Sequence, residues 1–530
     1  MRGHDAVVVG SGPNGLVAAN LLADAGWHVV VLEAAGEPGG AVRSAVITAP
    51  GYVSDLCSAF YPLAGPPSPL AALGLEDVGL QWRHAPNVLS HLTPAGDVVT
   101  LSRDPEATAD SVERYARGDG QRWRAAYAEW LRVGPPLLRA LFTPFPPVRP
   151  SWELLRTAGL GDSLRLLRRM LMPVRSLGQE LFDGAGSRLL LTGCALHVDL
   201  TPDAALGGGY GWLLAMLAQQ RGFPVPAGGA GALTAALVTR LRQRGGEVHC
   251  AARVTRVEVQ AGVARAVRTA DGRRWPAHRA VIADVAAPAL YRDLLGPDVV
   301  PARLLEDIAR FSFDSATLKV DWALARPLPW RAEGVAGSGT VHLGADLAGL
   351  SRYAADLAGD TVPAQPFLIC GQMTTADPDR SPPGTESLWA YTHLPQRRDW
   401  SDPVVAGVAA ALEDALERQA PGFRDSIVAR RVTGPGQLEA ENANLVGGAL
   451  GGGTAAIHQQ LVFRPVPGLG RADTPVDGLF LASAGAHPGG AVHGGPGANA
   501  ARAALARRAR VGGWLYGAGM RALHGRLYRR

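Results

Sequence analysis

The sequence predicts an α/β fold, in which a discontinuous Rossmann-like domain is built from separate parts of the chain and holds an inserted α+β domain. Three observations predict it. Residues 6–33 follow the order strand, glycine-rich turn, helix, strand; residues 224–290 return to strand patterns after a largely helical stretch; and residues 477–510 add a buried strand, a glycine-rich loop and a helix. A chain of 530 residues has room for two or three domains.

The first element is a strand, "DAVVVG", that leads into the turn Gly10-Ser-Gly12-Pro-Asn-Gly15. The apolar period of "LVAANLLADAG" predicts a helix, and "HVVVLE" predicts a second buried strand that closes at Glu33. We expect Gly10 to permit the tight turn, Gly12 to let the backbone approach a pyrophosphate, and Gly15 to allow close helix–strand packing. Glu33 is placed to accept hydrogen bonds from a ribose. The pattern predicts a Rossmann-like dinucleotide site.

A second glycine pair follows in "EPGGAVRS", with Gly39 and Gly40 six residues beyond Glu33 and then Arg43. Such a pair lets the chain fold back over the pyrophosphate, and an arginine there can reach a phosphate or the far half of the cofactor. A nicotinamide dehydrogenase does not need this pair. The spacing therefore favours a flavoprotein.

The glycine-rich stretch "SAGAHPGGAVHGGPGANAA" at 483–501 joins the strand "DGLFLASAG" to the helix "GANAARAALARRAR". Residues 495–500 resemble a second fingerprint, but ten residues separate them from the strand and no acidic residue follows Asp477 to hold a second ribose. We expect one nucleotide site made from both ends of the chain. Backbone N–H groups and bare Cα atoms of this stretch suit a flat flavin ring.

"GLFLASAGAHPGGAVHGGPGANAA", with "GGGTAAIHQQLVFRPVPG" before it, resembles the C-terminal signature of the phytoene-desaturase-like FAD-dependent oxidoreductases, and is most similar to their pyridine nucleotide-disulfide oxidoreductase domain-containing branch. The N-terminal "VVVGSGPNGLVAANLLADAGWHVVVLEAAGEPGGAV" and the central "PAGGAGALTAAL" resemble the same family. The resemblance implies noncovalent FAD, a substrate domain over the flavin and substrates that are often lipophilic polyenes or retinoids. The FAD contacts it implies are Gly10, Gly12, Pro13, Asn14, Gly15, Glu33, Ala34, Gly39, Gly40, Ala41, Val42, Arg43, Val254, Gly485, Gly489, Gly490, Ala491 and Val492.

With this resemblance, the fold class is α/β with a discontinuous FAD-binding domain of the glutathione-reductase-like type that carries a Gly-Gly doublet. The expected FAD-binding parts are 1–75, 224–290 and 471–510. The expected substrate-domain parts are the largely helical 76–223 and the sheet-bearing 291–470, and residues 511–530 form a basic tail. Within the helical part, we expect the glycines of 207–211 to form a loop between helices.

Four cysteines lie far apart, at 57, 194, 250 and 370, which predicts neither a redox dithiol nor a zinc cage and indicates a reduced intracellular protein. No signal peptide or long apolar span is recognised, so we expect a cytoplasmic chain. Lys319 is the only lysine, and this arginine bias indicates codon composition more than nucleic-acid binding. The tail 501–530 holds eight arginines and no acidic residue.

The sequence leaves several functional questions open. His487 is the candidate acid/base or flavin-polarising residue, against a loop histidine bonded to backbone, and no metal is expected. Three functions remain: a dehydrogenase, desaturase or saturase acting on an apolar substrate, a flavin amine-oxidase-type enzyme, or an FAD-bound interaction protein with little turnover. The electron acceptor (oxygen, a quinone or a nicotinamide) and a homo-oligomeric state are open too.

Two segments suggest contact with a membrane. The amphipathic, arginine-rich stretch 152–177 is either a solvated helix face over a core or a surface for a membrane or lipid-like substrate. The tail mixes arginine with Trp514, Leu515 and Tyr516, which suits an interfacial helix at the inner face of a membrane. The alternative for the tail is packing on the body or on a second subunit, and its glycines predict that it is not one continuous helix.

Overall fold

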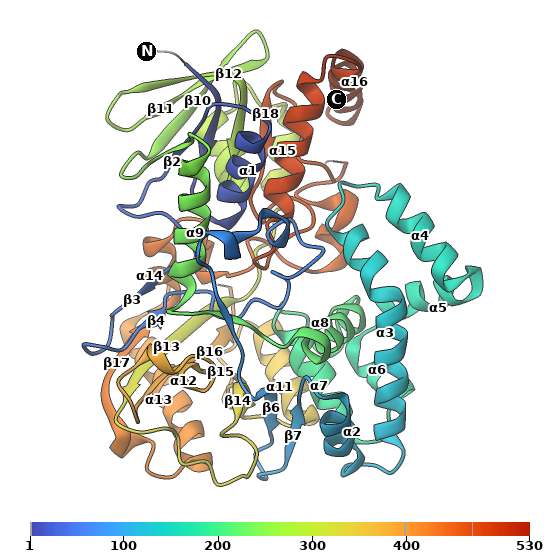
Figure 1. Cartoon of the computed structure of the whole chain (residues 1–530), viewed down its shortest axis with the longest axis vertical. Helices are drawn as coiled ribbons and strands as arrows, with labels where there is room; N and C mark the ends of the chain where they lie inside the picture. Colours follow the sequence, from blue (N-terminus) through green and yellow to red (C-terminus); the bar gives the residue numbers. More distant parts are fainter. Residues whose placement is uncertain (1–2, 397–398, 469, 530) are drawn as a thin grey trace.

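The computed structural model describes residues 3–396, 399–468 and 470–529 and contains two large sheets, one above the other in Figure 1. The α/β class predicted from the sequence is confirmed. The first sheet has the order β10-β11-β12-β1-β2-β9, with β18 beside β12. Its strands are β1 (His4–Val9), β2 (Val29–Leu32), β9 (Glu247–His249), β10 (Val254–Gln260), β11 (Val263–Thr269), β12 (Arg274–Ala283) and β18 (Leu479–Leu481).

Strands β1, β2, β9, β12 and β18 are parallel to their neighbours, whereas β10, β11 and the start of β12 form an antiparallel meander. The central parts of the parallel strands, at 6–9, 29–32, 280–283 and 479–481, are apolar because both faces of this part of the sheet are covered. One face packs against three helices, α1 (Pro13–Asp24), α9 (Ala230–Gln243) and α15 (Gly495–Arg508). The sheet thus collects strands from 4–32, 247–283 and 479–481, as a discontinuous domain requires.

The second sheet has the order β17-β13-β16-β15-β14-β6-β7. Helix α13 (Asp402–Gln419) covers one of its faces, and the opposite face meets a helical block at the right of Figure 1. The strands are β6 (Asn87–Leu92), β7 (Val98–Leu101), β13 (Ala316–Leu324), β14 (Ser338–Leu343), β15 (Leu368–Gln372), β16 (Glu386–Leu394) and β17 (Ile427–Thr433).

The helical block comes almost entirely from residues 105–221. Its members are α2 (Pro105–Glu113), α3 (Asp119–Leu141), α4 (Val148–Ala158), α5 (Leu160–Leu171), α6 (Val174–Leu181), α7 (Ala185–Leu196) and α8 (Gly207–Arg221). The remaining elements are α10 (Ala302–Ile308), α11 (Leu347–Ala358), α12 (Met373–Ala376), α14 (Pro435–Glu441), α16 (Gly513–Leu527) and the two-stranded pairs β3 (Ser44–Ala45) with β4 (Ser54–Asp55) and β5 (Trp82–Arg83) with β8 (Val225–Pro226).

One prediction about local structure is wrong, and a second is wrong in part. The glycines of 207–211 form the first turns of α8, where a Cβ on Gly209 would lie 2.7 Å from the Met170 carbonyl oxygen, so these glycines serve close helix packing. The prediction that glycines interrupt the tail holds at Gly512, since α15 ends at Arg508 and α16 begins at Gly513, but it is wrong for Gly517 and Gly519, which lie within the continuous helix α16. It is held by packing: the Tyr516 hydroxyl donates to Asp473 (2.7 Å), and His524 is buried. Tertiary contacts therefore outweigh the low helix propensity of glycine.

Candidate active site

The glycine-rich turn lies between the end of β1 and the start of α1, as predicted. Gly10 has φ +93°, which L-residues rarely adopt, and a Cβ there would lie 2.7 Å from the Asp284 carbonyl oxygen. A Cβ on Gly15 would lie 2.3 Å from the Gly10 carbonyl oxygen. The geometry accounts for Gly10 as the tight turn and for Gly15 as the point of close packing.

Gly12 has a neighbour that the sequence did not reveal. A Cβ on Gly12 would lie 2.6 Å from Oδ2 of Asp284, and the same oxygen accepts the Gly15 N–H at 2.8 Å. Burial raises the pKa of Asp284 to about 7, against the Gly15 hydrogen bond, which lowers it. Gly12 thus makes room for a carboxyl group beneath the turn. The available signal was an acidic residue directly after a buried strand, β12, whose carboxyl end meets the turn.

Glu33 directly follows β2, and its side chain holds the glycine-rich turn in place. Its carboxylate accepts hydrogen bonds from the Ser11 N–H (2.9 Å), the Ser11 hydroxyl (2.6 Å) and the Ala35 N–H (2.8 Å). The Ala252 N–H donates to the Glu33 carbonyl oxygen (2.7 Å), so the chain that enters β10 at Val254 runs beside Glu33. The structure therefore brings together Glu33 and Val254, which are far apart in sequence.

The second glycine pair folds back over the turn, as the sequence predicted. The Gly39 N–H donates to the Ser11 carbonyl oxygen at 3.1 Å. Gly39 and Gly40 have φ +122° and +57°, and a Cβ on Gly40 would lie 3.1 Å from the Cα of Gly12. Only glycine permits this approach of one loop to the other.

Arg43 binds backbone on both sides of this loop. Its Nε donates to the Gly40 carbonyl oxygen (2.9 Å), and its Nη2 donates to the Glu441 carbonyl oxygen (3.3 Å). The Ser58 N–H donates to the Ala41 carbonyl oxygen at 3.2 Å. Arg43 thus connects the glycine pair to the segment before Asn442. Its Nε and Nη2 groups already donate to the protein backbone.

The C-terminal loop 489–492 is held by a histidine. His493 Nε2 lies 2.9 Å from the Gly490 carbonyl oxygen, and the Gly495 N–H donates to His493 Nδ1 (2.9 Å). These partners require a neutral ring with the proton on Nε2, and burial lowers the pKa of His493 to about 4. Ala491 has φ +75°, an uncommon conformation for a residue with a Cβ.

The two ends of the chain meet where α15 packs on α1. A Cβ on Gly497 would lie 1.9 Å from the Asn14 carbonyl oxygen, so this glycine serves helix packing and not a second nucleotide. Asn14 Oδ1 is buried without a hydrogen-bond partner among the residues that the structure describes. A hydroxyl group of a bound dinucleotide would satisfy it. The orphaned oxygen, the start of α1 at Pro13 and the glycine cradle together fit FAD.

His487, the candidate catalytic residue, lies beside α3. Its Nε2 is 3.1 Å from the Thr143 carbonyl oxygen, and burial lowers its pKa to about 4 although this contact opposes the shift. The ring is neutral and its Nε2 proton is engaged by backbone. These contacts are what a loop histidine bonded to backbone requires, and the catalytic role stays a prediction.

A row of polar side chains on the second sheet faces the first domain. Thr317, Lys319 and Asp321 alternate along β13, so they share one face. Lys319 is buried, and its Nζ donates to Asp321 Oδ2 (2.6 Å) and to the Asp55 carbonyl oxygen (2.9 Å). Asp55 belongs to β4, which pairs with β3, so this face abuts the segment that follows the second glycine pair.

Aromatic rings continue this face on β16. Trp389 and Tyr391 stack with centroids 5.9 Å apart and planes 14° apart, and Phe60 lies 5.9 Å from Trp389. Burial raises the pKa of Tyr391, and the thiol of Cys57 is among its electrostatic neighbours. The rings therefore form an apolar wall close to the end of the 41–58 segment, and sequence reasoning did not identify it.

An acid–base cluster lies at one end of this wall. His393 Nδ1 is 3.0 Å from Asp199 Oδ1. Burial would lower the pKa of His393, but attraction to Asp199 and Asp314 outweighs burial and raises it. Burial, and then repulsion from Asp199, raises the pKa of Asp314 to about 6. Asp314 accepts the Gly451 N–H (2.6 Å), and a Cβ on Gly490 would lie 2.6 Å from the Gly451 carbonyl oxygen. The cluster is thus one loop away from 489–492.

One group of side chains elsewhere has metal-ligand spacing. Donor atoms of His4, His28 and Glu247 lie within 4.8 Å of one another. They sit at the start of β1, just before β2 and in β9, at the edge of the sheet opposite the glycine-rich turn. The prediction that the active site uses no metal stays a prediction.

The fold and the site are those of a dinucleotide-binding oxidoreductase with a second, separate sheet. The family model described as "Flavin containing amine oxidoreductase" matches residues 14–504. The chain belongs to this family and is an FAD-dependent oxidoreductase.

Two curated relatives span nearly the same length. The mouse pyridine nucleotide-disulfide oxidoreductase domain-containing protein 2 is 27% identical over 94% of this chain and 92% of that protein. The zeta-carotene-forming phytoene desaturase of Myxococcus xanthus is 27% identical over 92% of this chain and 91% of that protein. A redesigned variant of putrescine oxidase has a similar fold, with a TM-score of 0.62 at 17% identity, over 95% of this chain and 98% of that chain. The resemblance to the phytoene-desaturase-like proteins is confirmed.

Proposed function

We propose that the protein binds FAD noncovalently in a glutathione-reductase-like domain with a Gly-Gly doublet, through the residues that the sequence predicts. The orphaned oxygen of Asn14 and the close approach of Gly40 to Gly12 support this assignment. We also propose the predicted domain parts, with 1–75, 224–290 and 471–510 holding the cofactor. When bound, FAD supplies the acceptor or donor for a hydride.

The substrate is lipophilic, of the polyene or retinoid type, and it is dehydrogenated, desaturated or saturated. The observation that carries this proposal is the aromatic wall of Phe60, Trp389 and Tyr391 beside the segment that follows the glycine pair. Stacked rings offer a flat apolar surface that excludes water from an extended carbon chain. Curated relatives include phytoene desaturases, which supports the same substrate class.

Anaerobic reduction of the purified flavoprotein tests the substrate class. A panel of solubilised polyenes and retinoids is compared with a panel of aliphatic mono- and diamines, and loss of the flavin absorbance is followed. We expect bleaching by a member of the first panel and at least tenfold slower bleaching in Tyr391→Ala, with unchanged FAD content. Bleaching by amines alone would overturn the lipophilic substrate. Reoxidation by oxygen, a quinone or NAD(P)⁺ then identifies the electron acceptor.

The second candidate is oxidation of an amine, and one observation favours it. Asp199 and Asp314 place two carboxyl groups at the end of the aromatic wall, and ionised carboxylates would bind an ammonium group. Asp199→Asn should then raise the KM for amines and leave the rate of flavin reduction by polyenes unchanged. If neither panel bleaches the flavin, an FAD-bound interaction protein with little turnover is the reading that survives.

A further inference from the structure

Exposed large apolar side chains are concentrated in two parts of the described chain. Two stretches, 131–171 and 511–527, hold most of them, and a contiguous apolar surface is unusual on a protein that stays free in water. The exposed side chains of these stretches are Leu131, Val148, Trp152, Leu160, Leu164, Leu167, Leu171, Val511, Trp514, Leu515, Leu523 and Leu527. The others are Val46, Val404, Val428, Leu461 and Phe463.

Helices α4 and α5 carry six of these exposed side chains. Leu160, Leu164, Leu167 and Leu171 recur at helical spacing and form one stripe along α5. Leu160 is 69% exposed and Leu164 is 59% exposed, whereas Leu166 packs inward. The two helices stand at the outer edge of the molecule in Figure 1. The apolar stripe of α5 thus has no covering element among the described residues.

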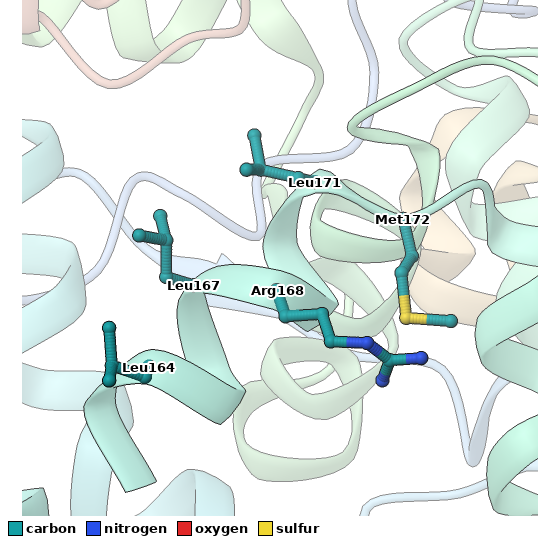
Figure 2. Close-up of a pocket in the computed structure, with 5 residues that line it drawn as sticks. All are labelled: Leu164, Leu167, Arg168, Leu171 and Met172. Atoms are coloured by element: carbon teal, nitrogen blue, oxygen red, sulfur yellow. The ribbon is translucent and has the colours of Figure 1, made fainter. Parts of the chain in front are cut away.

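Figure 2 shows the side chains of this stripe at close range. Leu164, Leu167 and Leu171 project from successive turns of α5, with Arg168 and Met172 beside them. Together these five residues line an open hollow of about 460 Å³. Four apolar side chains and one arginine therefore share this patch.

The two apolar stretches also carry the positive charge of the chain. Residues 131–171 contain seven arginines and two acidic residues, a net charge of +5. Residues 511–527 contain two arginines and no acidic residue, a net charge of +2. The whole chain has +5, so the remaining residues carry −2. Apolar exposure and positive charge thus coincide in these two stretches.

Arg471 contacts both stretches. Arg471 Nη1 donates to the Phe145 carbonyl oxygen (3.3 Å), just before α4, and the Arg471 guanidinium lies 5.8 Å from the ring of Tyr516 on α16. Leu461 and Phe463, which precede Arg471 in the chain, are exposed. Arg471 thus links the two stretches, and we name the exposed side chains of α4, α5, 461–463 and α16 the basic apolar face.

We infer that the basic apolar face docks the protein on an anionic lipid bilayer. A bilayer interface accepts leucine and tryptophan side chains into its apolar boundary and binds arginine through lipid phosphates, which matches both features of the face. Exposed Trp152 and Trp514 suit the depth at which indole rings anchor. None of the described helices is both long and apolar enough to cross a membrane, so contact is peripheral. The role of docking in substrate supply rests on the proposed function, because only a lipophilic substrate would enter the site from the bilayer.

Vesicle co-sedimentation of the full-length, FAD-loaded protein tests the inference. The probes are vesicles of phosphatidylcholine alone and of phosphatidylcholine with phosphatidylglycerol, at low and high salt. We expect binding to the anionic vesicles, and at least a tenfold weaker partition for Leu160→Ser/Leu164→Ser/Leu167→Ser. Val428→Ser is the matched control, because Val428 is exposed to the same extent as Leu167 but lies on β17. It should bind as the parent does.

Two further measurements keep the outcome decisive. Retained FAD shows that the triple variant is folded, and Trp152→Ala replaces it if it is not, with a smaller loss expected. No binding by the parent, or equal binding by parent and variants, would overturn the inference. The last measurement is the molar mass of parent and triple variant by light scattering without lipid. If the parent is a dimer and the triple variant is a monomer, the face joins two copies and the membrane assignment is wrong. None of these readouts uses a substrate, so failure here is distinct from failure of the proposed function.

Discussion

Replacing Asp284 by asparagine isolates the carboxyl group beneath the glycine-rich turn. Asparagine has nearly the same shape and stays neutral at every pH, and its amide oxygen accepts the Gly15 N–H in place of Oδ2. Gly12 still faces a group of the same size. The substitution therefore removes the ionisation of residue 284 and preserves its packing.

The expected effect follows from the raised pKa. Burial moves the pKa of Asp284 from its ordinary value of 3.8 to about 7, which corresponds to a cost of about 4 kcal/mol for the ionised form in the folded state. The folded protein holds the proton more tightly than the unfolded chain, so this group makes stability fall as pH rises from about 4 to about 7, with no further loss above. Between pH 5 and pH 8 the Asp284→Asn variant should gain about 2–3 kcal/mol relative to the parent.

Urea unfolding at pH 5 and pH 8, followed by tryptophan fluorescence, measures this gain. Asp110→Asn is the control, because Asp110 is exposed and its replacement should give the same difference from the parent at both pH values. If Asp284→Asn also differs from the parent by equal amounts at pH 5 and pH 8, residue 284 does not carry a buried proton and the electrostatic reasoning is refuted.

Three other substitutions test the cofactor site. Glu33→Ala removes the acceptor of three hydrogen bonds and should weaken FAD binding by about 1.5–3 kcal/mol, measured by titrating the FAD-free protein; unchanged affinity would refute the ribose assignment. Gly497→Val inserts a side chain against the Asn14 carbonyl oxygen and should lower both the melting temperature and FAD content, whereas Gly519→Val, in open space, should change neither. His487→Ala should slow flavin reduction if the ring serves chemistry, and an equal rate would leave His487 as a brace on Thr143.

The sequence predicted the geometry of the glycine-rich turn and of the second glycine pair, since this geometry is local and depends on residue type. Gly10 and Gly39 occupy backbone conformations that favour glycine, and the strand–turn–helix order is contiguous in the chain. Asp284 escaped notice because its contacts with the turn come from a strand some 270 positions away. The aromatic wall was equally hidden: Trp389 and Phe60 meet only after the second sheet folds against the first domain.

Lys319 is the one lysine in a chain whose other basic side chains, histidine aside, are arginine, and its surroundings explain why lysine stands at this position. The chain uses arginine at all its other cationic side chains, which says nothing about any one position. At position 319 the ammonium group sits among Asp321 and the Asp55 carbonyl oxygen, all buried, and Arg380 Nη2 binds Asp55 Oδ2 at 2.8 Å. A compact ammonium satisfies acceptors that converge on one point, whereas a planar guanidinium spreads its donors over a wider fork. Lys319 therefore links the second sheet to the segment around Asp55 through contacts that suit a lysine and do not suit an arginine.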